Sequence, residues 1–170
     1  MQIEKNLPQF NNSKSLIVAA GDHDAKIYSV FNGIIKKLEL FCIPNPCFTD
    51  REGFVMQKIK GKYLTSGAVY TPKKEYLRVK FLTGLRKDIK NILRRESEIK
   101  NIYLFAPEYI ADPIIKSMPV QIQEKIKIMH SGNYALQHPF KLLNMIKEKE
   151  FDIIGESVPL KEEARKLLSK

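Results

Sequence analysis

Residues 77–93 read LRVKFLTGLRKDIKNIL, and this stretch decides how the rest of the chain is expected to fold. Its apolar residues recur about every 3.6 positions, the spacing of an α-helix with one buried face. The members of this apolar stripe are Leu77, Phe81, Leu85, Ile89, Ile92 and Leu93. The cations on the opposite side are Lys80, Arg86, Lys87, Lys90 and Arg94. The pattern predicts one helix, from Glu75 to about Glu96, that packs on a core with one face and presents cations to water with the other.

Positive charge is concentrated around this helix. Residues 51–100 contain fourteen Lys or Arg and five Asp or Glu, a net +9 of the chain's +10. The rest of the chain has fifteen basic and fourteen acidic residues. A local excess of this size attracts polyanions such as RNA, DNA, ribosomes and acidic lipid. The alternative is that the lysines are merely solvated and serve solubility.

Composition predicts an ordinary single domain. The chain has 170 residues, 44% of them hydrophobic, which is enough for one core. No apolar run approaches the roughly twenty residues of a membrane helix, and the first residues lack the layout of a secretory signal. Cys42 and Cys47 have no wider cysteine framework around them. We expect a cytoplasmic protein with reduced thiols, no membrane span, no cofactor and no bound metal.

Three antiparallel strands are predicted before the helix. Residues 15–21 are apolar on both faces, which suits a central strand. Residues 25–31 alternate, and Asn32-Gly33 tolerates the positive φ of a tight hairpin turn. Residues 34–43 form the third strand. Its faces are predicted as Leu38, Leu40 and Cys42 on one side and Lys37, Glu39 and Phe41 on the other.

A connection of almost thirty residues follows, because Pro44 and Pro46 end the third strand. Connections of this length tend to be functional or disordered. The apolar residues that allow a small hairpin inside it are Ile59, Tyr63, Val69 and Tyr70.

Strands and helices alternate after the basic helix. The predicted elements are a strand over 101–106, a helix that opens at Asp112-Pro113 and breaks at Pro119 before 120–125, a strand over 126–130 and a helix over 140–149. The order β-β-β, long loop, α-β-α-β-α predicts an α/β fold with a mixed five-stranded sheet, the layout of ribonuclease H-like domains. We divide the chain into a loose lead-in (1–14), a ribonuclease H-like domain (15–150) and a C-terminal extension with a short helix (151–170).

Several short motifs resemble a known family. They are LIVAAGD (16–22), AKIY (25–28), DREG (50–53), Phe81-Leu82, IYLFAP (102–107), Asn133-Tyr134 and PFKLL (139–143). With them the chain resembles, over about residues 15–149, the bacterial family named for proteins required for attachment to host cells. That family is related to the middle domain of archaeo-eukaryotic peptide-chain release factors. The resemblance implies a ribonuclease H-like fold and work in translation, on ribosomes or RNA, while the family's name records an attachment phenotype.

One departure from the release factors concerns catalysis. Factors that cleave peptidyl-tRNA carry Gly-Gly-Gln at the tip of the corresponding loop, whereas this loop has Gly53, Gly61 and Gly67 singly. We therefore do not expect peptide release.

Other catalytic arrangements are incomplete in this sequence. Asp22-His23-Asp24 suits a turn in which Asp caps the backbone, with a divalent cation as the alternative. A metal-dependent nuclease needs converging carboxylates, and Asp22 lies beyond the first strand with only Glu108 and Asp112 after the fourth. The histidines His130 and His138 have no recognisable nucleophile beside them. The sequence therefore favours a protein that is not an enzyme.

The expected function is RNA or ribosome binding through the long loop and the outer face of the helix. Aromatic residues interleaved with the loop lysines, among them Phe54 and Tyr63, are suited to stacking on unpaired bases. The predicted nucleic-acid-binding residues are Lys58, Lys60, Lys62, Lys73, Lys74, Lys80, Arg86, Lys87, Lys90 and Arg94. The alternatives are a protein-interaction or host-attachment-linked module and, third, a metal-dependent nuclease.

Overall fold

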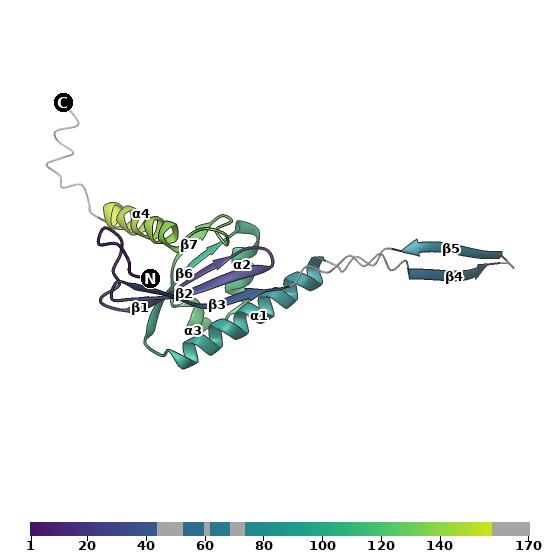
Figure 1. Ribbon diagram of the computed structural model, residues 1–170, viewed down its shortest axis with the longest axis horizontal. Coiled ribbons are helices and arrows are strands. Elements are labelled where there is room, and N and C mark those ends of the chain that lie inside the picture. The colour runs from purple at the N-terminus through teal and green to yellow at the C-terminus, as the bar shows by residue number, and fades with distance from the viewer. Residues whose placement is uncertain (44–52, 60–61, 69–73, 158–170) are drawn as a thin grey trace, which may run out of the picture.

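A computed structural model describes residues 1–43, 53–59, 62–68 and 74–157. Its main sheet has the strand order β3-β2-β1-β6-β7 (Figure 1). The strands are β1 (Lys14–Ala20), β2 (Asp24–Phe31), β3 (Ile34–Cys42), β6 (Ile99–Ala106) and β7 (Ile126–Ser131). The first three pair antiparallel, while β6 runs parallel to both β1 and β7. This is the mixed sheet of a ribonuclease H-like fold, so the predicted fold class is confirmed.

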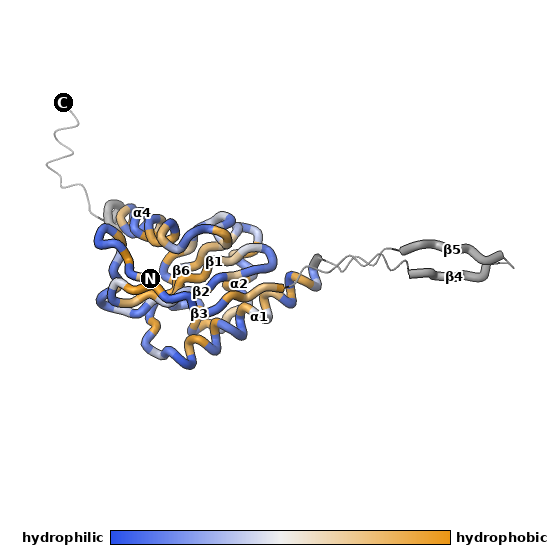
Figure 2. The backbone as a smooth tube through the Cα atoms, in the orientation of Figure 1, coloured by the Kyte–Doolittle hydropathy of each residue, from blue (hydrophilic) through white to orange (hydrophobic). Residues whose placement is uncertain are grey.

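Helices cover both faces of the sheet. The helices α1 (Lys74–Arg95), α2 (Glu108–Ser117) and α3 (Val120–Gln123) pack on one face, and α4 (Pro139–Ser157) packs on the other. Figure 1 shows α1 and α4 on opposite sides of the strands. In Figure 2 the hydrophobic colour follows the central strands, whereas α1 alternates between hydrophobic and hydrophilic along its length. None of the described helices is long and apolar enough to cross a membrane.

The central strand β1 explains why two cores form. Leu16 and Val18 face the core beneath α1, and Ile17 and Ala19 face the core beneath α4. All four side chains are almost completely buried. A strand that is apolar on both faces must be covered on both, because alternate side chains point to opposite sides.

The N-terminal segment lies against the edge of the sheet. The backbone N–H of Ile3 donates to Gly33 at 2.7 Å and that of Ile35 donates to Met1 at 2.9 Å. Ile3 and Leu7 are buried in the core beneath α4. This segment therefore protects part of the exposed edge of β3 from pairing with another chain.

The β2–β3 hairpin agrees with the sequence at its turn and differs within its second strand. Asn32 and Gly33 both have positive φ, 46° and 70°, as the predicted tight turn requires. Further on, Ile27 pairs with Glu39 and Tyr28 with Lys37, so Leu38 is an extra, bulged residue. The prediction that Leu38 shares a face with Leu40 and Cys42 was wrong, because the bulge interrupts the alternation between Lys37 and Glu39. Phe41 packs on the core beneath α1, while Leu40 is 55% exposed.

The long connection contains a hairpin, as predicted, and Val69 and Tyr70, two of the residues that suggested it, lie outside the described residues. The strands β4 (Gly53–Ile59) and β5 (Lys62–Ala68) pair antiparallel and form a two-stranded sheet of their own (Figure 1). Neither is hydrogen-bonded into the five-stranded sheet.

Two helices differ from their predicted bounds. The helix expected to open at Asp112-Pro113 begins at Glu108, and Pro113 lies inside it. The last helix, expected to end at Lys149, continues to Ser157. A proline is tolerated within α2 because another group takes over the hydrogen bond that its missing N–H leaves open, as described below. The C-terminal helix expected from Pro159 lies outside the described residues.

Candidate nucleic-acid interface

The outer face of α1 gathers five of the predicted cations. Lys80, Arg86, Lys87, Lys90 and Arg94 are all exposed, while Phe81, Leu85, Ile89 and Ile92 on the other side are buried. Successive helical residues turn by about 100° and rise by about 1.5 Å, so these cations fall within an arc of about 120° and a length of about 21 Å. We call this surface the basic face of α1. It is held rigidly because its helix is anchored on the core by four buried apolar side chains.

Among the described residues, no ion pair neutralises the cations of the basic face. The two ion pairs among the described residues are Lys14–Glu96 at 3.1 Å and Lys127–Glu150 at 2.6 Å, and neither includes a residue of this face. Asp88 is the acid closest in sequence, and it is half-buried on the inner side of α1. Burial raises the pKa of its carboxyl, which the neighbouring charge of Lys87 partly opposes. Because no ion pair among the described residues includes these cations, the basic face presents a positive potential to solvent.

The remaining predicted cations lie in the long connection. Lys58 and Lys62 belong to β4 and β5, near the turn of the hairpin, and Lys74 is the first residue of α1. The side chains of these three lysines are outside the described part of the chain, and so are Lys60 and Lys73 altogether. The structure thus brings together the helical half of the predicted site.

Arg95 is an exposed cation at the end of α1 that the predicted set omitted. The predicted set was limited to cations opposite the apolar stripe, and this criterion included its neighbour Arg94. The signal that identifies Arg95 is its place in the last helical turn, where an exposed basic side chain also complements the helix dipole.

Arg78 has a different role from the other cations of α1. Its Nη2 donates to the backbone oxygen of Tyr109 at 2.6 Å. Pro113 lies four residues beyond Tyr109 and has no N–H, so this oxygen lacks its helical donor. The guanidinium of Arg78 replaces the missing donor and joins α1 to α2. Arg78 is therefore directed toward α2 and is not part of the basic face.

The Asp22-His23-Asp24 segment forms a hydrogen-bonded turn. The N–H of Gly21 donates to the oxygen of Asp24 at 2.8 Å, and the N–H of Ile43 donates to the oxygen of His23 at 2.8 Å. The Tyr109 hydroxyl donates to the Asp22 carboxylate. Within the described residues, no three His, Cys, Asp or Glu side chains are placed to hold a metal ion. The backbone hydrogen bonds of this segment are those of a turn, and the buried Nδ1 of His23 has no partner among the described residues.

The other candidate catalytic residues have structural surroundings. Glu108 and Asp112 are exposed on α2. His130 stacks on Phe105 with ring centroids 4.6 Å apart, and burial lowers its pKa. His138 lies edge-to-face against Phe140, with ring centroids 5.0 Å apart. These contacts are aromatic packing, and within the described part of the chain no hydrogen bond joins either histidine ring to a Ser, Thr or Cys side chain.

Comparison with known proteins finds similarity at the level of the fold. No protein-family model and no curated protein matches the sequence. Among solved structures, the chain is similar to an archaeal translation termination factor, aRF1, with 9% identity, a TM-score of 0.47 and coverage of 87% of this chain and 43% of that one. It is also similar to Dom34 of S. cerevisiae, a translation termination-like factor involved in RNA quality control pathways and interacting with Hbs1. That match has 15% identity, a TM-score of 0.42 and coverage of 85% and 39%.

The chain is similar to release-factor-like proteins. An archaeal actin homologue, Ta0583, is similar as well, with 8% identity, a TM-score of 0.44 and coverage of 85% of this chain and 51% of that one. The chain therefore spans about half, or less than half, of the proteins it matches. Because the identities are so low, and because actin-like and release-factor-like proteins both match, the likeness concerns the fold alone.

Proposed function

We propose that this chain is a non-enzymatic RNA- or ribosome-binding domain that acts in the cytoplasm. The observation that carries the proposal is the basic face of α1, with five exposed cations in one arc and no ion pair to any of them among the described residues. The loop lysines, from Lys58 to Lys74, would extend this phosphate-binding track. The sequence resemblance to relatives of release-factor middle domains implies the same kind of partner.

Geometry favours a polyanion over other partners of the basic face. A helix with five cations spread over about 21 Å of one face suits the regular negative charge of a nucleic-acid backbone. Insertion into an acidic membrane surface would require apolar side chains on the same face. The apolar stripe of α1 is buried in the core, which leaves Tyr76 and Val79, 63% and 62% exposed, as the large apolar side chains of α1 that a lipid surface could reach. Two such side chains offer little apolar area for insertion.

The test is binding of ribosomal RNA as a function of salt. We expect the affinity to fall steeply between low and physiological salt, since each phosphate contact releases counterions. In the variant Lys87→Glu/Lys90→Glu/Arg94→Glu, the slope of log affinity against log salt should decrease by about two to three, at about 0.7–0.9 per lost contact. Fluorescence anisotropy of a labelled RNA fragment measures both quantities.

A matched variant separates the basic face from net charge. Lys36→Glu/Lys141→Glu/Lys147→Glu makes the same charge change at exposed lysines on β3 and α4. If both triple variants weaken binding equally, the attraction is general and the proposed site is wrong. Weak salt dependence of the unmodified protein would also contradict the proposal. In cell lysate, co-sedimentation with ribosomal subunits distinguishes a ribosomal partner from a free RNA.

A protein-interaction or host-attachment-linked module is the second candidate, and exposed apolar residues on α4 favour it. Phe151 is 76% exposed and Ile153 is 48% exposed. Exposed apolar side chains of this size occur at protein interfaces. This candidate predicts a complex in lysate that survives high salt and is lost in Phe151→Ser, with RNA binding unchanged.

A further inference from the structure

A polar cavity of about 330 Å³ lies on the face of the sheet opposite α1. Its walls come from the N-terminal segment, β6, β7 and α4. Four carboxamide side chains line it, from Gln9, Asn11, Asn12 and Asn101, together with the ring of Phe10. Its volume is within the range of small-ligand sites, about 300–1,000 Å³. It shares no residue with the basic face of α1.

Two β-bulges shape this corner of the sheet. Lys14 pairs with Ile99 and Ser15 with Asn101, so β6 carries Lys100 as an extra residue. Ile102 pairs with Ile126 and Tyr103 with Ile128, so β7 carries Lys127 as an extra residue. Bulges redirect side chains and are common beside functional sites. Here the second bulge brings the Nζ of Lys127 to 2.6 Å from the Oε1 of Glu150 on α4.

The N-terminal segment is held in an uncommon conformation where it meets the cavity. Phe10 has a φ of 53°, in the left-handed region that favours glycine. Its ring packs edge-to-face against Tyr103, with centroids 5.7 Å apart. A bulky residue in this region is strained, and such strain persists mainly where the surroundings fix it. In this conformation the half-buried ring of Phe10 forms part of the cavity wall.

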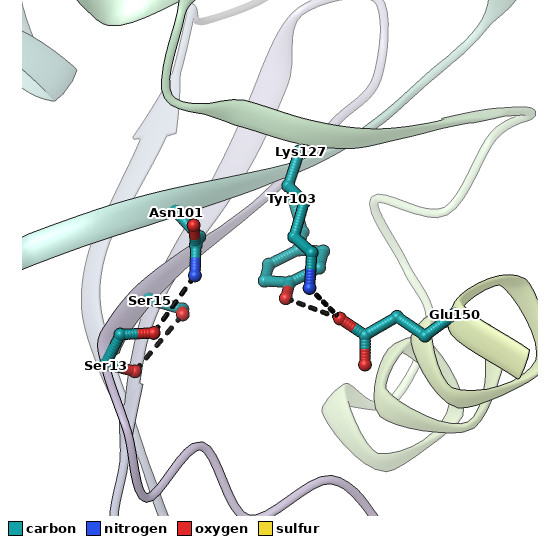
Figure 3. A network of polar contacts seen from close by, with 6 residues as sticks. All are labelled: Ser13, Ser15, Asn101, Tyr103, Lys127 and Glu150. Atoms are coloured by element: carbon teal, nitrogen blue, oxygen red, sulfur yellow. Dashed lines mark hydrogen bonds and ion pairs between the residues drawn. The ribbon is translucent and has the colours of Figure 1, made fainter. Parts of the chain in front are cut away.

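The polar groups of the cavity are only partly used within the protein. Asn101 donates to Ser13 Oγ at 3.0 Å, and Tyr103 donates to Glu150 Oε1 at 2.9 Å, as Figure 3 shows. Burial raises the pKa of the Tyr103 hydroxyl, and Glu150 adds to the shift, so this hydroxyl remains a donor. Among the described residues, no hydrogen bond engages the second oxygen of Glu150 or the side-chain amides of Asn11 and Asn12. These groups leave both donors and acceptors for a ligand.

Charge and shape narrow the class of ligand. Lys127 and Glu150 are the charged side chains among the described residues that line the cavity, and they pair with each other. The site therefore offers no net charge to attract an anion or a cation. The Nε2 of Gln9 already donates to the backbone oxygens of Glu4 and Leu7, so Asn11 and Asn12 are the asparagines left for a ligand. A carboxamide carries a donor and an acceptor side by side, which matches the edge of a nucleobase. The rings of Pro8 and Phe10 supply apolar surface for a flat ring.

We propose that this cavity binds a nucleobase, with carboxamides on its hydrogen-bonding edge and Phe10 against its ring. The base comes either from a free nucleoside or from an unpaired nucleotide of an RNA strand, since both present the same edge. The proposal is independent of RNA binding by the basic face of α1, because the two sites lie on opposite faces of the sheet.

The experiment is a titration of the full chain, followed by NMR, with each of the four ribonucleosides and with ribose and glucose. We expect at least one nucleoside to saturate at millimolar or lower concentration, with no saturation by the sugars. In the variant Asn11→Ala/Asn12→Ala, the affinity for that nucleoside should fall by about tenfold. Asn91→Ala/Asn144→Ala removes two asparagines that do not line the cavity and should leave the affinity unchanged. The basic-face variant Lys87→Glu/Lys90→Glu/Arg94→Glu should bind the nucleoside normally.

Three outcomes would overturn the proposal: no saturation by any nucleoside, equal binding of the sugars, or equal effects of the two asparagine variants. Glu150→Gln provides a second readout that preserves size and the acceptor for Tyr103, and it should alter which base is preferred. A trinucleotide containing the preferred base distinguishes the sources. Much tighter binding of the trinucleotide indicates an RNA strand, and equal binding indicates a free nucleoside.

Discussion

Pro113 leaves the backbone oxygen of Tyr109 without a helical donor, and Arg78 supplies one from the neighbouring helix. We predict that Arg78→Ala lowers the free energy of unfolding by about 1 kcal/mol, because the hydrogen bond is charge-assisted but partly exposed to water. In a Pro113→Ala background, the N–H of residue 113 can donate to Tyr109 instead. Arg78→Ala should then have little effect. Urea denaturation of the unmodified protein, the two single variants and the double variant measures this coupling. If Arg78→Ala lowers the free energy of unfolding equally with Pro113 present and in the Pro113→Ala background, the coupling is contradicted.

His130 gives the stability of the fold a dependence on pH. Burial lowers its pKa, Lys149 lowers it further and Glu148 opposes the shift. The buried Nε2 has no partner among the described residues, so the native state favours the neutral ring. Below the ordinary histidine pKa of about 6.5, the unfolded chain therefore binds more protons at His130 than the native state does. We predict that the contribution of His130 to the free energy of unfolding is fully present above a pH of about 6.5. It should be lost as the pH falls through the lowered pKa that His130 has in the native state.

The variant His130→Phe tests the origin of this dependence. Phenylalanine retains the stacking on Phe105, whose ring centroid lies 4.6 Å from that of His130, and removes the titratable group. Its unfolding free energy should vary less between pH 7 and pH 5 than that of the unmodified protein. His138→Phe is the matched control for loss of a histidine. If the two variants give the same pH profile, His130 is not the responsible group.

At the scale of elements, α1 packs so closely on β3 that one position needs glycine. A Cβ at Gly84 would collide with the ring of Phe41. Alanine is better than glycine in a helix by about 1 kcal/mol, but overpacking costs about 1–3 kcal/mol. We predict that Gly84→Ala destabilises the protein by about 1 kcal/mol. In a Phe41→Leu background, the ring that the new Cβ would meet is absent. Gly84→Ala should then stabilise the protein instead of destabilising it. Thermal unfolding of the single and double variants would show whether this reversal occurs.

Elements with a strong local pattern could be predicted from the sequence. The apolar stripe of α1 and the two apolar faces of β1 identify their buried sides by periodicity alone. The Asn32-Gly33 turn follows from the two residue types that tolerate positive φ. The outward direction of Lys80, Lys87 and Lys90 is predicted by the same periodicity as the buried stripe. That part of the candidate interface therefore came from local information.

Features that depend on a distant partner could not be predicted. The bulge at Leu38 depends on how β3 pairs with β2, and the residue types in β3 give no local signal from which it could be predicted. The helix around Pro113 is possible because Arg78, thirty-five positions earlier in the sequence, supplies a donor. The cavity behind Phe10 requires Glu150 and Lys127 to meet across two elements. Each is a tertiary contact, which overrides local preference.

At the scale of the whole molecule, the hairpin of β4 and β5 has no hydrogen-bonded ladder with the five-stranded sheet, because its strands pair with each other. We therefore expect the hairpin to contribute little to the stability of the rest of the chain. We predict that replacing residues 53–68 by a short Gly-Ser linker leaves cooperative unfolding intact. The midpoint should change by only a few degrees, because the closing entropy of a loop depends weakly on its length.

The same deletion separates the contributions of hairpin and helix to RNA binding. It removes Lys58, Lys60 and Lys62 and retains the five cations of the basic face of α1. If those lysines contact phosphates, the salt slope should decrease by about two to three while binding persists. An unchanged slope would assign binding to α1 alone, and complete loss of binding from a folded deletion would assign it to the hairpin. Loss of cooperative unfolding would instead contradict the independence of the hairpin, because its removal would then have disturbed the cores.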